Sequence, residues 1–143
     1  MSISPSLKVL NQIKSEQDYQ GSDITLTSIK SLNEDSSWKG PSVGTILTSN
    51  GNPALFSSQQ NGIVFPPQNV GIQIQFRYDF IQQEKQYSQK GEIYLLVPAT
   101  GEHKLYGKTL SNSDKPIASN PIPQFNYSIT NTSGNSFLVT ITL

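Results

Sequence analysis

Residues 70–80, VGIQIQFRYDF, carry the pattern that decides the fold. Large apolar or aromatic side chains alternate with smaller or polar ones along this segment. The apolar positions are Val70, Ile72, Ile74, Phe76, Tyr78 and Phe80, and the polar positions are Gln73, Gln75, Arg77 and Asp79. Successive side chains of a β-strand point to opposite faces, so the pattern predicts a strand with one buried and one solvated face.

A second strand is expected at residues 92–97, where Ile93, Leu95 and Val97 alternate after a glycine. The polar residues 82–89 lie between the two expected strands. Their composition is typical of a loop, so we expect a loop there that joins two neighbouring strands.

The end of the chain predicts a β-hairpin. Phe125, Tyr127 and Ile129 alternate, a turn surrounds Gly134, and alternation resumes over residues 137–143. Shorter strands are expected upstream, at residues 24–26, 45–48, 54–56 and 62–65. Residues 111–123, which are rich in Pro, Ser and Asn, predict a long surface connection.

About eight short strands at fairly even spacing are typical of a β-sandwich or jelly roll. We therefore expect an all-β fold: one antiparallel β-sandwich domain over residues 21–143. Residues 1–20 are expected to form an N-terminal arm or a short helix, because Leu7, Leu10 and Ile13 recur at a spacing of three.

Composition excludes several function classes. The 143 residues contain ten Lys and Arg against ten Asp and Glu, so the formal net charge is zero. Nucleic acid is not an expected partner, because phosphate binding depends on clustered Lys and Arg. Cysteine is absent and His103 is the one histidine, which excludes disulfides, thiolate sites and His-rich zinc sites. No metal or other cofactor is expected.

An enzyme is not favoured either. His103 lies in a polar turn, and no GxSxG segment is present to supply a serine nucleophile. Glu84, Glu92 and Glu102 could supply the two carboxylates of a glycosidase, but scattered acids in any chain offer such pairs, and surface solvation is the preferred interpretation.

The candidate binding residues are Trp38, Lys39 and Arg77. Trp38 is the one tryptophan, lies beside Lys39 among turn residues, and is interpreted either as a buried plug at the end of the sandwich or as an interfacial anchor. Arg77 is the one arginine and is expected on the solvated face of its strand. An amphipathic ring beside a lysine suits a membrane surface or the face of a sugar.

Neither a signal-peptide core nor an apolar run of about 20 residues occurs in the sequence. We therefore expect synthesis in the cytoplasm without a signal peptide. Storage in inclusions and release from the cell by lysis or a leaderless route both stay open.

Several segments in order resemble the aegerolysin family, including the small crystal-inclusion aegerolysins of insecticidal bacteria. They are SDITLTSIKSL, the turn with Trp38 and Lys39, GIVFPPQNVGIQIQFR, KGEIYLLVPATGEHKLYG and the final QFNYSITNTSGNSFLVTITL. The chain differs from the fungal members in having a single tryptophan and an N-terminal extension.

This resemblance implies a non-enzymatic β-sandwich that binds membrane lipid or a surface receptor and acts with a larger partner protein to form pores. Two other interpretations stay open. One is a structural subunit of a capsid, tail or filament that packs as a homo-oligomer, with residues 1–20 as an exchanging arm. The other is a carbohydrate-binding, lectin-like module that uses Trp38 or a tyrosine to stack on sugars.

Overall fold

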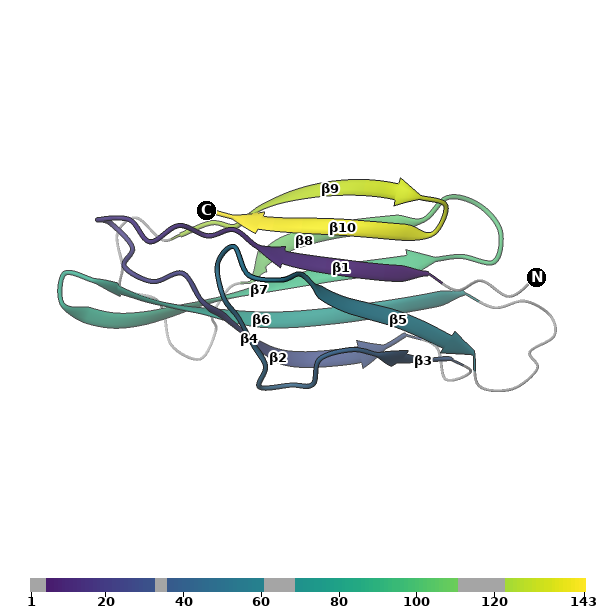
Figure 1. The fold of residues 1–143 in the computed structure, drawn as a ribbon, viewed down its shortest axis with the longest axis horizontal. Helices are drawn as coiled ribbons and strands as arrows, with labels where there is room; N and C mark the ends of the chain where they lie inside the picture. Colours follow the sequence, from purple (N-terminus) through teal and green to yellow (C-terminus); the bar gives the residue numbers. More distant parts are fainter. Residues whose placement is uncertain (1–4, 33–35, 61–68, 111–122) are drawn as a thin grey trace.

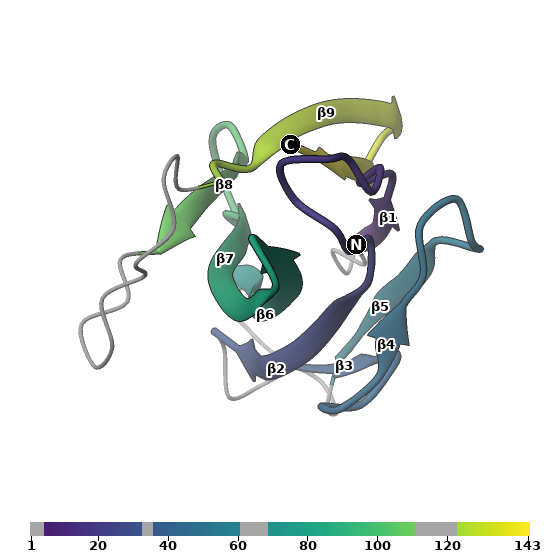
Figure 2. The ribbon, with the colours of Figure 1, turned by 90° about the vertical axis from the view of Figure 1, so that its left-hand side faces the viewer.

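A computed structural model describes residues 5–32, 36–60, 69–110 and 123–143. Within these ranges the chain forms ten β-strands and no helix (Figure 1). The strands make two sheets that curve around one interior, as Figure 2 shows in a view along the strands. The prediction of an all-β, single-domain sandwich is confirmed.

Each sheet has five strands in its described part. Sheet A has the spatial order β3 (Ser36–Lys39), β5 (Ala54–Gln60), β1 (Ser6–Asn11), β10 (Ser136–Thr142) and β9 (Asn126–Ser133). Sheet B has the order β4 (Ile46–Leu47), β2 (Ile24–Ser31), β6 (Val70–Gln82), β7 (Lys85–Val97) and β8 (Lys104–Leu110). Neighbouring strands are antiparallel except β1 and β10, which pair in parallel.

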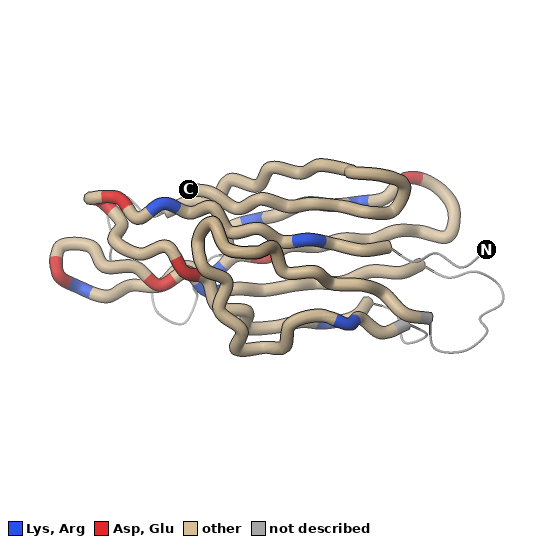
Figure 3. Tube along the Cα trace, in the orientation of Figure 1, with Lys and Arg blue, Asp and Glu red and all other residues tan. Residues whose placement is uncertain are grey.

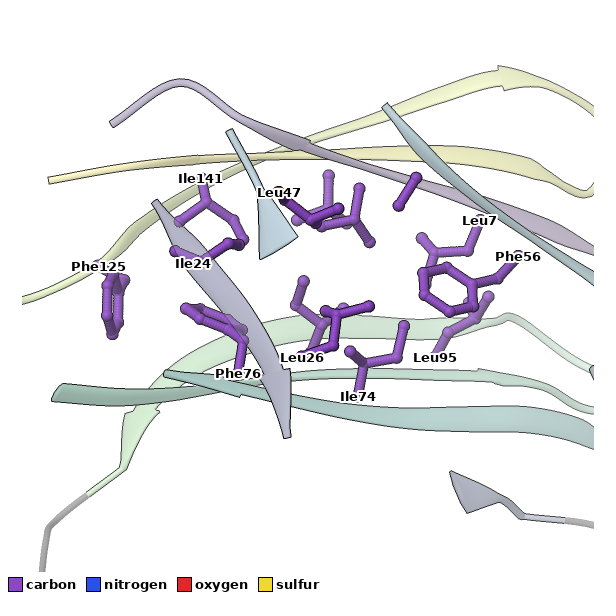
Figure 4. Close-up of a cluster of buried hydrophobic side chains, with 14 of the residues drawn as sticks. Leu7, Ile24, Leu26, Leu47, Phe56, Ile74, Phe76, Leu95, Phe125 and Ile141 are labelled. Atoms are coloured by element: carbon purple, nitrogen blue, oxygen red, sulfur yellow. The ribbon is translucent and has the colours of Figure 1, made fainter. Parts of the chain in front are cut away.

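The core forms where the inner faces of the two sheets meet (Figure 4). The six alternate apolar positions predicted for β6 are all buried, and Phe76 and Tyr78 are fully enclosed. Sheet A covers them with apolar side chains from its central strands, among them Leu7, Phe56 and Ile141. This interdigitation of two inner faces explains why alternation in β6 specifies a sandwich.

The prediction of a loop over residues 82–89 is wrong. Strands β6 and β7 pair without interruption from Val70↔Val97 to Gln82↔Lys85, so the turn contains two residues. Gln83 and Glu84 both have positive φ, at 52° and 66°, which is the conformation of a type I′ hairpin turn. This turn joins the two strands directly and matches their twist. The polar residues before and after the turn therefore lengthen the β6–β7 hairpin (Figure 1).

The helix considered for residues 1–20 is also wrong for the described residues 5–20. Ser6–Asn11 forms β1, which lies in the middle of sheet A and pairs with both β5 and β10. Leu7 and Val9 point into the core, followed at the same period by the buried Asn11 and Ile13. This segment therefore follows the two-residue period of a strand and not the three-residue spacing of a helix. As a strand it pairs with β5 and β10 on its two sides and buries its alternate side chains in the core.

Asn11 is the polar member of this row. Its Nδ2 donates to the carbonyl oxygens of Ser22 and Leu47, both at 2.7 Å, and its Oδ1 accepts from Ile13 N at 2.9 Å. These bonds attach the end of β1 to β4 of sheet B. A buried amide is stable only when its hydrogen bonds are satisfied, as they are here.

The C-terminal hairpin is confirmed by β9 and β10, which pair across a turn in which Gly134 has φ +54°. Of the shorter strands predicted upstream, those at 24–26, 45–48 and 54–56 correspond to β2, β4 and β5. The predicted strand at 62–65 lies outside the described residues, as does nearly all of the connection predicted at 111–123.

We predict that Leu7→Ala lowers the free energy of unfolding by about 2–5 kcal/mol, because it empties a fully buried site at the centre of sheet A. Lys8→Ala is the matched control, since Lys8 is exposed on the same strand, and should change stability by less than about 0.5 kcal/mol. Urea denaturation measures both. Two equally small effects would contradict a central position for β1.

Candidate functional site: the outer face of sheet B

Trp38 lies in β3 and points into the sandwich. Its partner across the strand pair is the buried Ser58, and its half-buried ring packs against the core. Its Nε1 donates to the carbonyl oxygen of Gly71 in β6 at 2.9 Å, so the indole connects the edge of sheet A to sheet B. Of the two interpretations of Trp38, this geometry favours the plug at the end of the sandwich.

Lys39 and Arg77 face elsewhere. Lys39 follows Trp38 in the strand and is exposed on the outside of sheet A. Arg77 lies on the outside of sheet B, about 20 Å along β6 from Gly71. Its Nε donates to both carboxylate oxygens of Asp79, at 2.9 and 3.2 Å, in an exposed ion pair. The three predicted residues therefore do not form one contact surface.

The outer face of sheet B instead brings together a row of polar and aromatic side chains that the sequence left dispersed. Its register places Gln75, Glu92 and Lys108 side by side on β6, β7 and β8. The next row contains Gln73, Tyr94 and Tyr106, with Lys30 of β2 beside Gln73. All of these residues belong to the polar phase of their strands, opposite the core.

Glu92 is buried although it lies on this outer face. Its side chain is 4% exposed, because neighbouring side chains lie over it. Its Oε1 accepts hydrogen bonds from the Nε2 atoms of Gln73 and Gln75, the latter at 3.0 Å, and its Oε2 lies 3.3 Å from Lys108 Nζ. The prediction that Glu92 is a solvated surface carboxylate is therefore wrong.

The hydrogen bonds decide the charge state of Glu92. Burial by itself would raise its pKa, but the hydrogen bonds from Gln75, Lys108 and Gln73, together with the positive charge of Lys108, lower the pKa below its usual value. Glu92 is thus a fixed anion at neutral pH. It holds the two glutamine amides and the lysine in place across three strands.

Tyr94 and Tyr106 form an aromatic pair beside this cluster. Their ring centroids are 5.0 Å apart and their planes differ by 17°. Tyr106 is 42% exposed and lies on β8, an edge strand, between Lys104 and Lys108 on the same face. We call Lys104, Tyr106 and Lys108 the β8 stripe: a ring with a cation on either side along one strand.

Net neutrality conceals an uneven distribution of charge (Figure 3). Lys30, Arg77, Lys90, Lys104 and Lys108 all lie on the outer face of sheet B. The acids on that face within the described residues are Asp79 and Glu92, which leaves an excess of positive charge. Described acids gather instead toward the end of the molecule that holds the β6–β7 turn (Figure 3).

A hollow of about 520 Å³ lies beside this hairpin. It is lined by Gln20, Asp79, Phe80, Ile81, Gln86, Tyr87 and Ser88. Gln20 is fixed there by two backbone hydrogen bonds with Ile81. Nearby, Tyr78 donates its hydroxyl to Gly21 O at 2.7 Å, and burial raises the pKa of Tyr78 to about 12.

The residues considered for catalysis do not converge. Glu84 lies at the hairpin turn, about 25 Å along β7 from Glu92, and Glu102 lies in the connection beyond the opposite end of that strand. His103 is exposed and its ring packs on Phe137 at 4.6 Å between centroids. Among the described residues there is no group of three His, Cys, Asp or Glu that could hold a metal ion.

The described part of the chain also has no helix with the length and hydropathy needed to cross a membrane. In comparisons with known proteins, no family model, curated protein or solved structure matches this chain.

We predict that Glu92→Gln lowers the free energy of unfolding at pH 7 by about 1–3 kcal/mol, because the new side chain has no charge and keeps one acceptor oxygen, so an NH2 group replaces the oxygen that faces Lys108. A lowered folded-state pKa stabilises the protein above the unfolded-state pKa, about 4.3, and this stabilisation disappears as the pH falls through the folded-state value. The difference between wild type and variant should therefore shrink from pH 6 to pH 3.

Urea midpoints over that pH range provide the measurement. Glu84→Gln removes a carboxylate from the exposed hairpin turn and is the matched control, since Glu84 makes no ion pair in the described structure. A wild-type advantage over Glu92→Gln that stays constant with pH would argue against an ionised, stabilising Glu92.

Proposed function

We propose that this protein is a non-enzymatic binding component that attaches to an anionic membrane surface through the outer face of sheet B, and that a larger partner protein completes a pore-forming system. The β8 stripe carries the proposal. It combines an exposed amphipathic ring with two cations on the same face of one edge strand.

Tyrosine rings and lysine side chains suit the membrane interface for separate reasons. The ring places apolar surface at headgroup depth and leaves its hydroxyl in water, and lysines are attracted to anionic headgroups. Lys30 and Lys90 extend the positive charge across the same sheet face. Glu92 supports the arrangement, because it holds Lys108 beside Tyr106.

Attachment through a rigid sheet differs from the single-anchor contact expected for Trp38. The sheet face is held by its strand register, so binding need not order a flexible segment first. The prediction of Trp38 and Lys39 as contact residues stays open and is tested together with the stripe.

We predict that the wild-type protein co-sediments with vesicles of phosphatidylcholine and phosphatidylserine in equal parts. The double variant Lys104→Gln/Lys108→Gln should lower the partition coefficient by about fivefold for each lysine, because each cation near an anionic surface contributes about 1 kcal/mol. Tyr106→Ala should also weaken binding, whereas Trp38→Phe should bind as the wild type does.

Lys8→Gln/Lys14→Gln is the matched control, since it removes the same charge from exposed positions outside sheet B. An equal loss of vesicle binding in both double variants would indicate electrostatic attraction of the whole protein and not contact through one face. Loss of vesicle binding in Trp38→Phe would indicate that the membrane contact lies near β3 and not at the β8 stripe. Binding to a sulfated oligosaccharide in preference to vesicles would favour the carbohydrate-binding interpretation instead.

The proposed role of the partner has its own test. Because pore formation is assigned to the larger protein, we expect vesicles loaded with a self-quenched dye to bind this chain to saturation without releasing the dye. Fluorescence recovery measures leakage, and detergent lysis sets the complete signal. Leakage caused by this protein alone would contradict its assignment as the binding component.

A further inference from the structure

We infer that β9 is a pairing edge through which two copies of this chain associate, joining their A sheets into one continuous sheet by an antiparallel β9–β9 pair. The inference goes beyond surface attachment and rests on a different part of the molecule. It starts from the fact that an edge strand presents unpaired backbone N–H and C=O groups to any strand of suitable shape.

β9 is one of four edge strands in the described structure. It is eight residues long, and its sequence, NYSITNTS, contains neither charge nor proline nor glycine. Seven of its eight residues are exposed. Ile129 in particular is 43% exposed, although it pairs with the buried Val139 and belongs to the inward-facing phase. Sheet B therefore leaves this part of β9 uncovered.

One end of β9 is anchored. Tyr127 donates its hydroxyl to Lys108 O at 2.8 Å, and its ring fills the space above Gly107, where a Cβ would collide with it. Just before β9, Phe125 N donates to Thr109 Oγ1 at 3.0 Å. The strand is thus fixed against β8 at its start, and residues 128–133 continue beyond that contact with β10 as their one neighbour among the described strands.

The other three edges have features that prevent pairing. β4 contains two residues. β3 contains four residues and ends in the exposed Lys39. β8 carries Lys104 and Lys108, and the hydroxyl of Tyr127 already occupies one of its carbonyl oxygens. Short length, lysines and covered carbonyl groups are the means by which proteins block strand addition.

These differences identify a second copy as the occupant. A strand that pairs with β9 must offer unpaired backbone N–H and C=O groups, and among the four described edges β9 is the one with neither lysines nor a length of four residues or fewer. Pairing of β9 with its copy is isologous and closes as a two-fold dimer, the commonest symmetry. It places uncharged side chains of β9 opposite one another, and a chain with zero net charge offers no long-range repulsion.

Cysteine scanning tests this geometry directly, because the chain contains no cysteine of its own. With the two-fold axis perpendicular to the sheet, one residue of β9 lies opposite its own copy. A cysteine one residue away would be separated from its copy by about 8 Å between Cα atoms, beyond the roughly 7 Å that a disulfide spans.

Single variants at Ser128, Ile129, Thr130, Asn131 and Thr132 are oxidised mildly and separated on non-reducing gels. We expect one position to form a covalent dimer rapidly and its two neighbours to stay monomeric. Thr100→Cys, exposed in the turn before β8, is the control for random collision and should not form a dimer.

Light scattering after size exclusion provides the second measurement, on the unmodified chain and on Thr130→Lys. The wild type should approach twice its 15.7 kDa with increasing concentration. Thr130→Lys should weaken the dimer by up to about fivefold, since it places like charges near each other, whereas Thr100→Lys should not. A constant 15.7 kDa without a cross-linking position, or long regular oligomers in place of a closed dimer, would overturn the inference.

Discussion

The inner face of β6 must be covered by a second sheet, and the rest of the structure depends on that burial. Its large side chains are fully or almost fully removed from water, which an isolated hairpin cannot achieve. The N-terminal strand is essential to the cover, because β1 fills the space between β5 and β10 at the centre of sheet A. Residues at the two ends of the chain consequently pair, from Ser6↔Ser136 to Asn11↔Ile141. Such non-local pairing is typical of slowly folding all-β domains.

Two buried polar residues show how the sandwich holds polar groups in buried positions. Asn11 interrupts an apolar row and satisfies its amide against carbonyl oxygens of Ser22 and Leu47. Glu92 interrupts a solvated face and becomes buried because Gln73, Gln75 and Lys108 donate to it. In both cases long-range hydrogen bonds compensate for desolvation. The hydrogen bonds of Asn11 join the two sheets, and those of Glu92 order the outer surface of sheet B.

Sequence patterns were sufficient to predict some strands and not others. The β6 strand and the C-terminal hairpin could be predicted because their periods are unbroken. The sequence of β1 was ambiguous because the polar Asn11 interrupts the apolar alternation expected of a strand. The burial of Asn11 depends on hydrogen-bond partners far along the chain. The turn at Gln83 and Glu84 has positive φ without the Asn-Gly or Gly residues that usually indicate it.

The candidate site was missed for a related reason. Lys104, Tyr106 and Lys108 stand at alternate positions in KLYGK, so their shared face could have been found once β8 was assigned as a strand. The alignment of Glu92 beside Lys108, and of Tyr94 beside Tyr106, depends on the register between β7 and β8. Trp38 drew attention as the one tryptophan, but its indole is bonded to Gly71, and rarity in a sequence does not indicate exposure.

The proposed dimer and the proposed membrane contact reinforce each other through symmetry. A two-fold axis perpendicular to the sheets turns each sandwich within its own plane, so the outer faces of both B sheets point in the same direction. β8 lies next to β9 across the side of the sandwich, which brings the two β8 stripes close to the axis. Two weak, parallel contacts on one surface act as a single stronger one, because the second binds at high effective concentration. The proposed surface-binding role would then need only modest charge on each copy, which fits a chain without net charge.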